Sequence, residues 1–148
     1  MKTFSNHLNE ALTKFNNPNH AACVKTLLDA GFEQGKKDTV TRDGVSYVVR
    51  AHRMPVTHAG RAIIVDYFDF DKVKCPNMIF IDPDRANNTI CLVDRQQLCQ
   101  FVNNNSSNRK MMWLTGRDED PQNMGKSTCF TIPLKSMERQ DWFKMENI

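Results

Sequence analysis

Apolar residues in the first part of the chain recur every three to four positions, which is the period of an amphipathic helix. This pattern predicts one helix over residues 5–16 and a second over about 18–30. Pro18 suits the first position of the second helix, because proline lacks the N–H that a helix start leaves unpaired. Since each helix is too short to be stable alone, we expect a packed helical hairpin over residues 5–31.

From residue 38 the pattern changes to strands. Asp43-Gly44 lies between two segments rich in β-branched residues, which is typical of a two-residue hairpin turn. Residues 78–81 and 90–93 are continuous apolar runs, and such runs are typical of central strands that are buried on both faces.

Asp94 follows the second run and suits the cap of a helix to about Val102, and a polar helix is expected from about Ser136. The sequence therefore predicts the α+β class: an N-terminal helical hairpin, then a mixed, mostly antiparallel sheet with one or two further helices. We expect one domain over residues 1–148. Its parts are the helical hairpin (5–31), the sheet with its crossing helix (38–134) and a polar C-terminal helix or tail (135–148).

The composition agrees with one ordinary soluble domain. The chain has 148 residues, of which 40% are hydrophobic and 25% charged, so disordered and fibrous proteins are poor fits. No apolar run is long enough for a membrane span, and the N-terminus lacks the apolar core of a secretory signal. The five cysteines form no C-x-x-C pair, which argues against a disulfide framework and a zinc ribbon. We therefore expect a cytoplasmic protein that does not bind membranes.

Charge is unevenly distributed, although the formal net charge is only +3. Cations dominate residues 36–61, and aspartates dominate residues 66–84. Cations hold phosphates and carboxylates hold Mg²⁺, so this division suits a protein that acts on nucleic acid. The alternative is a solvated strand face of an ordinary soluble protein. The candidate nucleic-acid-binding residues are Lys36, Lys37, Arg42, Arg50, His52, Arg53 and Arg61.

A short acidic motif adds candidate catalytic residues. Asp84 follows Pro83, and an apolar strand then leads to Asp94-Arg95-Gln96. Over residues 5–102 this order resembles the restriction-endonuclease-like nucleases, which carry an aspartate, a gap and then an (Asp/Glu)-x-Lys motif. The resemblance implies that Asp84 and Asp94 bind Mg²⁺, while Gln96 stands where that family has lysine. The local alternative is that Asp84 belongs to a turn and Asp94 caps a helix.

Asp66 is a further candidate metal ligand. Strand alternation places it on the same face as Phe68 and Phe70, where a carboxylate is costly to bury unless it is paired or bound to metal. The alternative is an ion pair with a nearby arginine.

Trp142 and Phe143 lie in an otherwise polar C-terminal segment. An exposed pair of this kind would bind a partner or a second subunit. Alternatively, both aromatic side chains pack back on the protein's own sheet.

The leading hypothesis from sequence is a small nucleic-acid-acting protein of phage or mobile-element type. If it is active, it is expected to be a Mg²⁺-dependent endonuclease. The first rival is a non-enzymatic binding or inhibitory module that engages a nucleic acid or a protein. The second rival is an enzyme that acts on a small molecule, but the sequence contains no cofactor-binding motif to support it.

Overall fold

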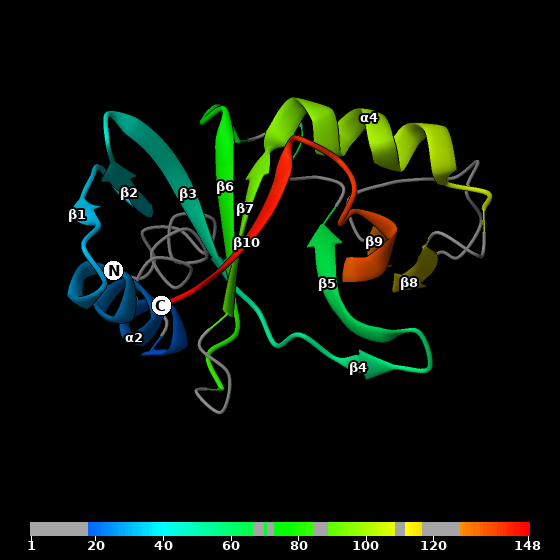
Figure 1. Ribbon diagram of the computed structural model, residues 1–148, viewed down its shortest axis with the longest axis horizontal. Coiled ribbons are helices and arrows are strands. Elements are labelled where there is room, and N and C mark those ends of the chain that lie inside the picture. Colours follow the sequence, from blue (N-terminus) through cyan, green and yellow to red (C-terminus); the bar gives the residue numbers. More distant parts are fainter. Residues whose placement is uncertain (1–17, 67–69, 71–72, 85–88, 109–111, 117–127) are drawn as a thin grey trace, which may run out of the picture.

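The computed structural model describes residues 18–66, 70, 73–84, 89–108, 112–116 and 128–148. In these residues, ten strands form two sheets that pack against each other, and the two α-helices lie on opposite faces of the larger sheet (Figure 1). Helix α2 (Pro18–Asp29) lies at one end of the molecule, and helix α4 (Arg95–Asn105) lies along the other.

The larger sheet has six strands in the order β1-β2-β3-β6-β7-β10. All neighbouring pairs are antiparallel except β3 and β6, which are parallel. The strands are β1 (Glu33–Gln34), β2 (Thr39–Arg42), β3 (Val45–Ala51), β6 (Asn77–Ile81), β7 (Thr89–Asp94) and β10 (Phe143–Asn147).

The smaller sheet has four antiparallel strands in the order β4-β5-β9-β8. These are β4 (Val56–Thr57), β5 (Gly60–Asp66), β8 (Trp113–Gly116) and β9 (Thr128–Pro133). The chain enters this sheet twice: β4 and β5 lie in the connection from β3 to β6, and β8 and β9 lie between α4 and β10.

The six-stranded sheet separates two apolar cores, because its central strands are apolar on both faces. On one face, Cys23, Val24 and Leu27 of α2 pack against β2, β3, β6 and β7. On the other face, α4 and the four-stranded sheet bury a larger core that includes Phe130, which is fully inaccessible. Burial of a large aromatic side chain of this kind contributes a few kcal/mol, roughly 2–3.

The expected fold class is corrected by this architecture. The protein is mostly sheet, with two sheets in place of the single mixed sheet that the sequence indicated. The N-terminal helical hairpin is not seen: its second helix is α2, whereas residues 5–16 lie outside the described part of the chain. Sequence periodicity indicates the strands β2, β3 and β5 to β9, but it misses β1, β4 and β10 and does not say which sheet a strand joins.

The expected C-terminal helix is also wrong. Leu134–Ser136 forms one turn of 3₁₀ helix, η2, and Phe143–Asn147 is the edge strand β10. Phe143 pairs with Val93 of β7 and is buried, so tertiary pairing prevails over the polar composition of this segment.

Several local predictions are confirmed. Asp43 and Gly44 have φ of 54° and 78° and connect the register pair Arg42 and Val45, as a two-residue hairpin requires. Strands β6 and β7 are buried on both faces within the larger sheet. Asp94 caps α4 by accepting a hydrogen bond of 2.9 Å from the N–H of Gln97.

Across the described residues, no helix combines the length and apolar character needed to cross a bilayer.

Candidate functional site

The two carboxylates of the nuclease-like motif lie at opposite ends of a strand pair. Asp94 is the register partner of Asn77 at one end of β6, whereas Asp84 lies beyond Ile81 at the other end. The four residue steps from Asn77 to Ile81 along β6 cover about 13 Å, and this length separates the two aspartates. The structure therefore does not bring Asp84 and Asp94 to a common ion.

The other residues of the proposed acidic site are also separated. Gln96 is exposed in the first turn of α4, and Asp66 ends β5 in the second sheet, opposite Cys129. Within the described segments, no group of three or more His, Cys, Asp or Glu side chains is arranged to hold a metal ion.

The basic strip that the sequence indicated is divided by two ion pairs. Arg50 is buried, and its Nη1 lies 2.9 Å from the Asp38 carboxylate. Arg42 donates two hydrogen bonds to Glu146, of 2.7 and 2.8 Å, and its guanidinium lies 4.5 Å from the ring centre of Phe32. Because the guanidinium groups of Arg42 and Arg50 are each paired with a carboxylate, we exclude both residues from the candidate surface.

The remaining members of the strip lie in two places. Lys36 and Lys37 are exposed in the turn between β1 and β2, at the edge of the sheet opposite β10. His52 and Arg53 are exposed after β3, and the side chain of Arg61, on β5, is 31% exposed.

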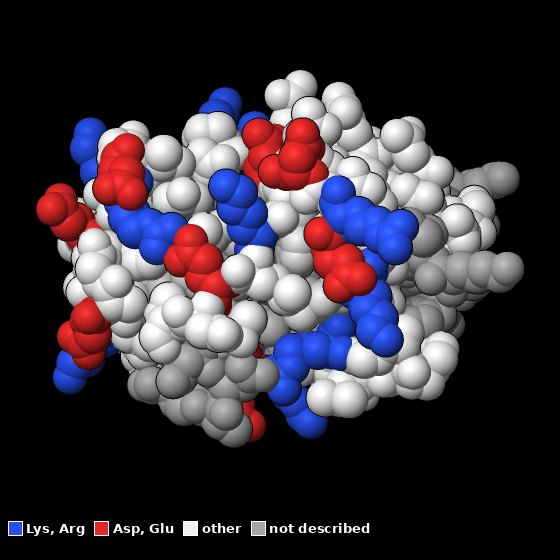
Figure 2. Space-filling view, viewed as in Figure 1, with Lys and Arg blue, Asp and Glu red and all other residues white. Residues whose placement is uncertain are grey.

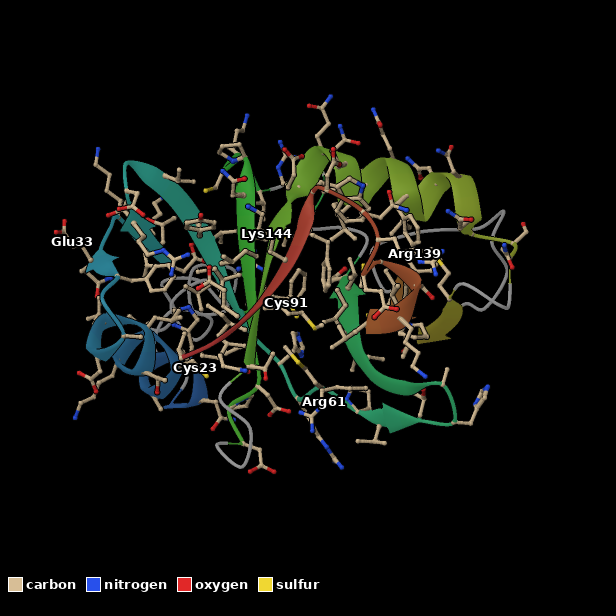
Figure 3. All side chains as sticks on the ribbon, viewed as in Figure 1. Cys23, Glu33, Arg61, Cys91, Arg139 and Lys144 are labelled. Carbon is tan, nitrogen blue, oxygen red and sulfur yellow. The ribbon has the colours of Figure 1, made fainter. Side chains whose placement is uncertain are left out.

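The structure adds two cations, Lys135 and Arg139, which lie far from the basic strip in the sequence. Ala62 of β5 pairs with Pro133 of β9, so Arg61 comes close to η2, which carries Lys135. Arg139 follows in the next turn and is exposed. Figure 2 shows basic side chains in a band across this face, between the positions of Arg139 and Arg61 labelled in Figure 3.

We call Arg53, Arg61, Lys135 and Arg139 the cationic band. In the described part of the chain, no ion pair is formed by Arg53, Lys135 or Arg139. Glu138 and Asp141, both exposed, are the acidic residues close to Arg139 in the sequence, fewer than the four cations of the band. The band therefore keeps an excess of positive charge.

Asp82 holds one end of the band in place. Its carboxylate is buried and accepts hydrogen bonds from the N–H of Met54 (2.9 Å) and of Asp84 (2.8 Å). Its Oδ2 also lies 3.9 Å from Nη1 of Arg61. Since Met54 follows Arg53 in the chain, Asp82 fixes the backbone beside one cation and the side chain of another. The sequence analysis missed Asp82, although its place between the strand and Pro83 was a signal.

A groove of about 560 Å³ lies on the part of the larger sheet that α2 does not cover, and no residue of the cationic band is among those that line it. Tyr47, Leu92 and Trp142 give it apolar surface, while Lys144 and Asp94 add charges of both signs. Its volume is in the range of small-molecule sites. The mixed charge suits a polar ligand such as a peptide better than a phosphate backbone.

The aromatic pair near the C-terminus packs on its own chain. Phe143 is 4% exposed, and the ring of Trp142 lies 5.6 Å from that of Phe101 in α4. Trp142 therefore presents part of one ring to the groove and does not form an exposed anchor with Phe143.

Cys91 is not a candidate nucleophile. Burial within the core raises the pKa of its thiol to about 12, although the nearby Arg61 acts in the opposite direction. Figure 3 places Cys91 in the interior of the molecule. The thiol is therefore neutral near pH 7, where the thiolate is the reactive form.

The ion pair between Arg42 and Glu146 joins strands β2 and β10 at the rim of the groove. Hydrogen bonds from Arg42 lower the pKa of the Glu146 carboxyl below its ordinary value of 4.5. A depressed carboxyl pKa stabilises the folded state at pH values above the unfolded pKa, and this stabilisation is lost as pH falls through the folded pKa.

We expect Glu146→Gln to lower the free energy of unfolding by up to about 1 kcal/mol near pH 7, because the pair is partly exposed. The difference from the unsubstituted protein should vanish below the folded pKa of Glu146. Urea unfolding measured from neutral to acidic pH tests this, with Glu33→Gln on the exposed strand β1 as the control. If Glu146→Gln and the unsubstituted protein still differ in unfolding free energy by the same amount in acid, the charge of the Glu146 carboxylate is not what stabilises the fold.

Comparison with known proteins places the chain in no family: no family model, curated protein or solved structure matches it. The resemblance to restriction-endonuclease-like nucleases therefore remains a prediction from the sequence.

Proposed function

We propose that the protein binds nucleic acid, through contacts of the cationic band with backbone phosphates, and acts as a binding module. The observation that carries this proposal is the convergence of Arg53, Arg61, Lys135 and Arg139 from separate segments of the chain. Asp82 contacts both Arg61 and the residue after Arg53, and the pairing of β5 with β9 brings Arg61 close to η2, which carries Lys135 and precedes Arg139. Guanidinium groups suit phosphate oxygens because their N–H donors match two oxygens at once.

Binding is better supported than hydrolysis. The carboxylates expected to hold Mg²⁺ lie at opposite ends of the β6–β7 pair, and Asp94 already serves as a helix cap. The mixed-charge groove lies outside the cationic band, so it offers a separate place for a polar ligand or a protein segment.

The experiment is a titration of fluorescently labelled DNA and RNA at increasing salt. Four phosphate contacts predict a slope of log K against log [salt] of roughly −3 to −4. Replacing Arg53, Lys135 and Arg139 together by alanine should reduce the magnitude of this slope by about 2–3 and weaken binding more than about tenfold at low salt. Arg61 is kept in this variant because it also contacts Asp82.

A matched control removes the same charge elsewhere. Lys25, Lys36 and Lys37 are exposed and lie outside the cationic band, so their triple alanine variant should bind almost as the unsubstituted protein does. If both triple variants lose the same amount of nucleic-acid affinity, binding depends on net charge alone and the proposed role of the cationic band is wrong. A response that does not depend on salt would indicate a protein or small-molecule partner.

The endonuclease hypothesis is tested on the same substrates with Mg²⁺ or Mn²⁺ added. We expect the nucleic acid to remain intact. Cleavage that is lost in both Asp84→Ala and Asp94→Ala would overturn the proposal of a binding module and support the endonuclease prediction.

A further inference from the structure

Strand β10 is an edge strand with an unusual charge pattern. Among the described strands it pairs with β7 alone, and it carries Lys144, Met145 and Glu146 at its centre. Met145 is 47% exposed. Edge strands invite pairing with another chain unless charge, proline or a bulge opposes it.

The hydrogen bonds of the neighbouring residues show which backbone groups of β10 point outward. Trp142 stands opposite Asp94 in the continued register, and its carbonyl accepts the Asp94 N–H at 3.1 Å. In an antiparallel pair, hydrogen-bonded positions alternate. The backbone groups of Lys144 and Glu146 therefore point toward β7, whereas those of Met145 and Asn147 point away from it.

One outward group near the start of the strand is already used. The N–H of Phe143 donates to the carbonyl of Gln140 at 3.3 Å, so the Phe143 carbonyl remains on the outer side. The outer edge thus presents the Phe143 carbonyl, both backbone groups of Met145 and the Asn147 N–H.

We propose that two copies of this chain pair through β10 in an antiparallel dimer whose two-fold axis passes beside Met145. In this register, Met145 exchanges two hydrogen bonds with Met145 of the second copy. The Asn147 N–H of each copy donates to the Phe143 carbonyl of the other. A two-fold axis satisfies both edges with the same set of contacts.

The side chains favour the same register. Lys144 stands opposite Glu146 of the second copy, and Glu146 stands opposite the second Lys144. These are non-hydrogen-bonded positions, where side chains come closest and opposite charges stabilise an antiparallel pair. Arg42 already contacts Glu146, so each interface carboxylate lies between two cations. A sequence with two lysines or two glutamates at these positions would repel its own copy.

This inference does not depend on nucleic-acid binding. It extends the six-stranded sheet across the two-fold axis and gives the assembly two cationic bands. A dimer would therefore bind a long nucleic acid more tightly than a monomer through the linked second contact.

The test is sedimentation of the full chain over a range of concentrations, with Met145→Pro as the disrupting variant. Proline removes an N–H that points outward and is tolerated on an edge strand, so this variant should fold but dimerise at least about tenfold more weakly. Met145→Ala keeps the N–H and should dimerise within a fewfold of the unsubstituted protein. Circular dichroism confirms that both variants fold.

A charge-exchange experiment tests the register itself. Lys144→Glu and Glu146→Lys each place like charges opposite one another in a homodimer, so each variant alone should be monomeric. Mixed together they restore both opposite-charge pairs and should form a heterodimer. A monomeric unsubstituted protein at every concentration, or a dimer unaffected by Met145→Pro, would overturn the proposal. So would a failure of the two charge variants to associate when mixed.

Discussion

Asp82→Ala is expected to lower the free energy of unfolding by about 3 kcal/mol. The substitution removes the carboxylate that accepts hydrogen bonds from the backbone N–H groups of Met54 and Asp84. The Met54 N–H is buried and then loses this acceptor. It also removes the carboxylate nearest to Arg61. Urea denaturation followed by circular dichroism measures the change.

Asp84→Ala is the matched control, because Asp84 is exposed and contributes its backbone N–H, not its carboxylate, to the contact with Asp82. Surface substitutions of this kind usually change stability by less than about 0.5 kcal/mol. Equal destabilisation by Asp82→Ala and Asp84→Ala would show that the buried carboxylate is not the anchor.

The same substitution has a functional consequence. Since Asp82 fixes the backbone next to Arg53 and contacts Arg61, its loss should loosen one end of the cationic band. Weaker nucleic-acid binding in folded Asp82→Ala, compared with Asp84→Ala, would connect this anchor with the proposed function.

Asp38→Ala is expected to produce a loss of similar size, about 3 kcal/mol, because it leaves the guanidinium of Arg50 buried without this carboxylate. The two side chains are 10% and 13% exposed, and Arg50 also donates to the Val49 carbonyl. Guanidinium groups remain charged at all ordinary pH values, so a change of protonation does not relieve the loss of this carboxylate.

The double variant Arg50→Met with Asp38→Leu should recover part of the lost stability, since a buried ion pair can be replaced by apolar side chains of similar volume. Glu33→Ala on the exposed strand β1 provides the control. If the double variant has a lower free energy of unfolding than Asp38→Ala, the packing of the aliphatic part of Arg50 contributes more to stability than the pairing of its charge.

Local features were the part of the fold that the sequence predicted well. The Asp43-Gly44 turn, the helix that follows Asp94 and the two central strands depend on neighbouring residues and on short-range periodicity. Assigning strands to two sheets depends instead on contacts such as Ala62 with Pro133, which join distant segments. No local pattern specifies that choice.

The candidate site was predicted less well for a related reason. The sequence placed Arg42 and Arg50 on a basic surface, but their partners, Glu146 and Asp38, were not visible from spacing. Lys135 and Arg139 join Arg53 and Arg61 only because β9 returns beside β5. A run of charges along a chain therefore indicates a surface only after the ion pairs are known.

The two excursions of the chain into the smaller sheet restrict how this protein can change. Along the sequence, β4 and β5 separate β3 from β6, and β8 and β9 separate β7 from β10, although these separated strands belong to the larger sheet. No single cut divides the described strands into one contiguous piece for each sheet. The two sheets must therefore be inherited together, and neither can be shuffled into another protein as an independent building block.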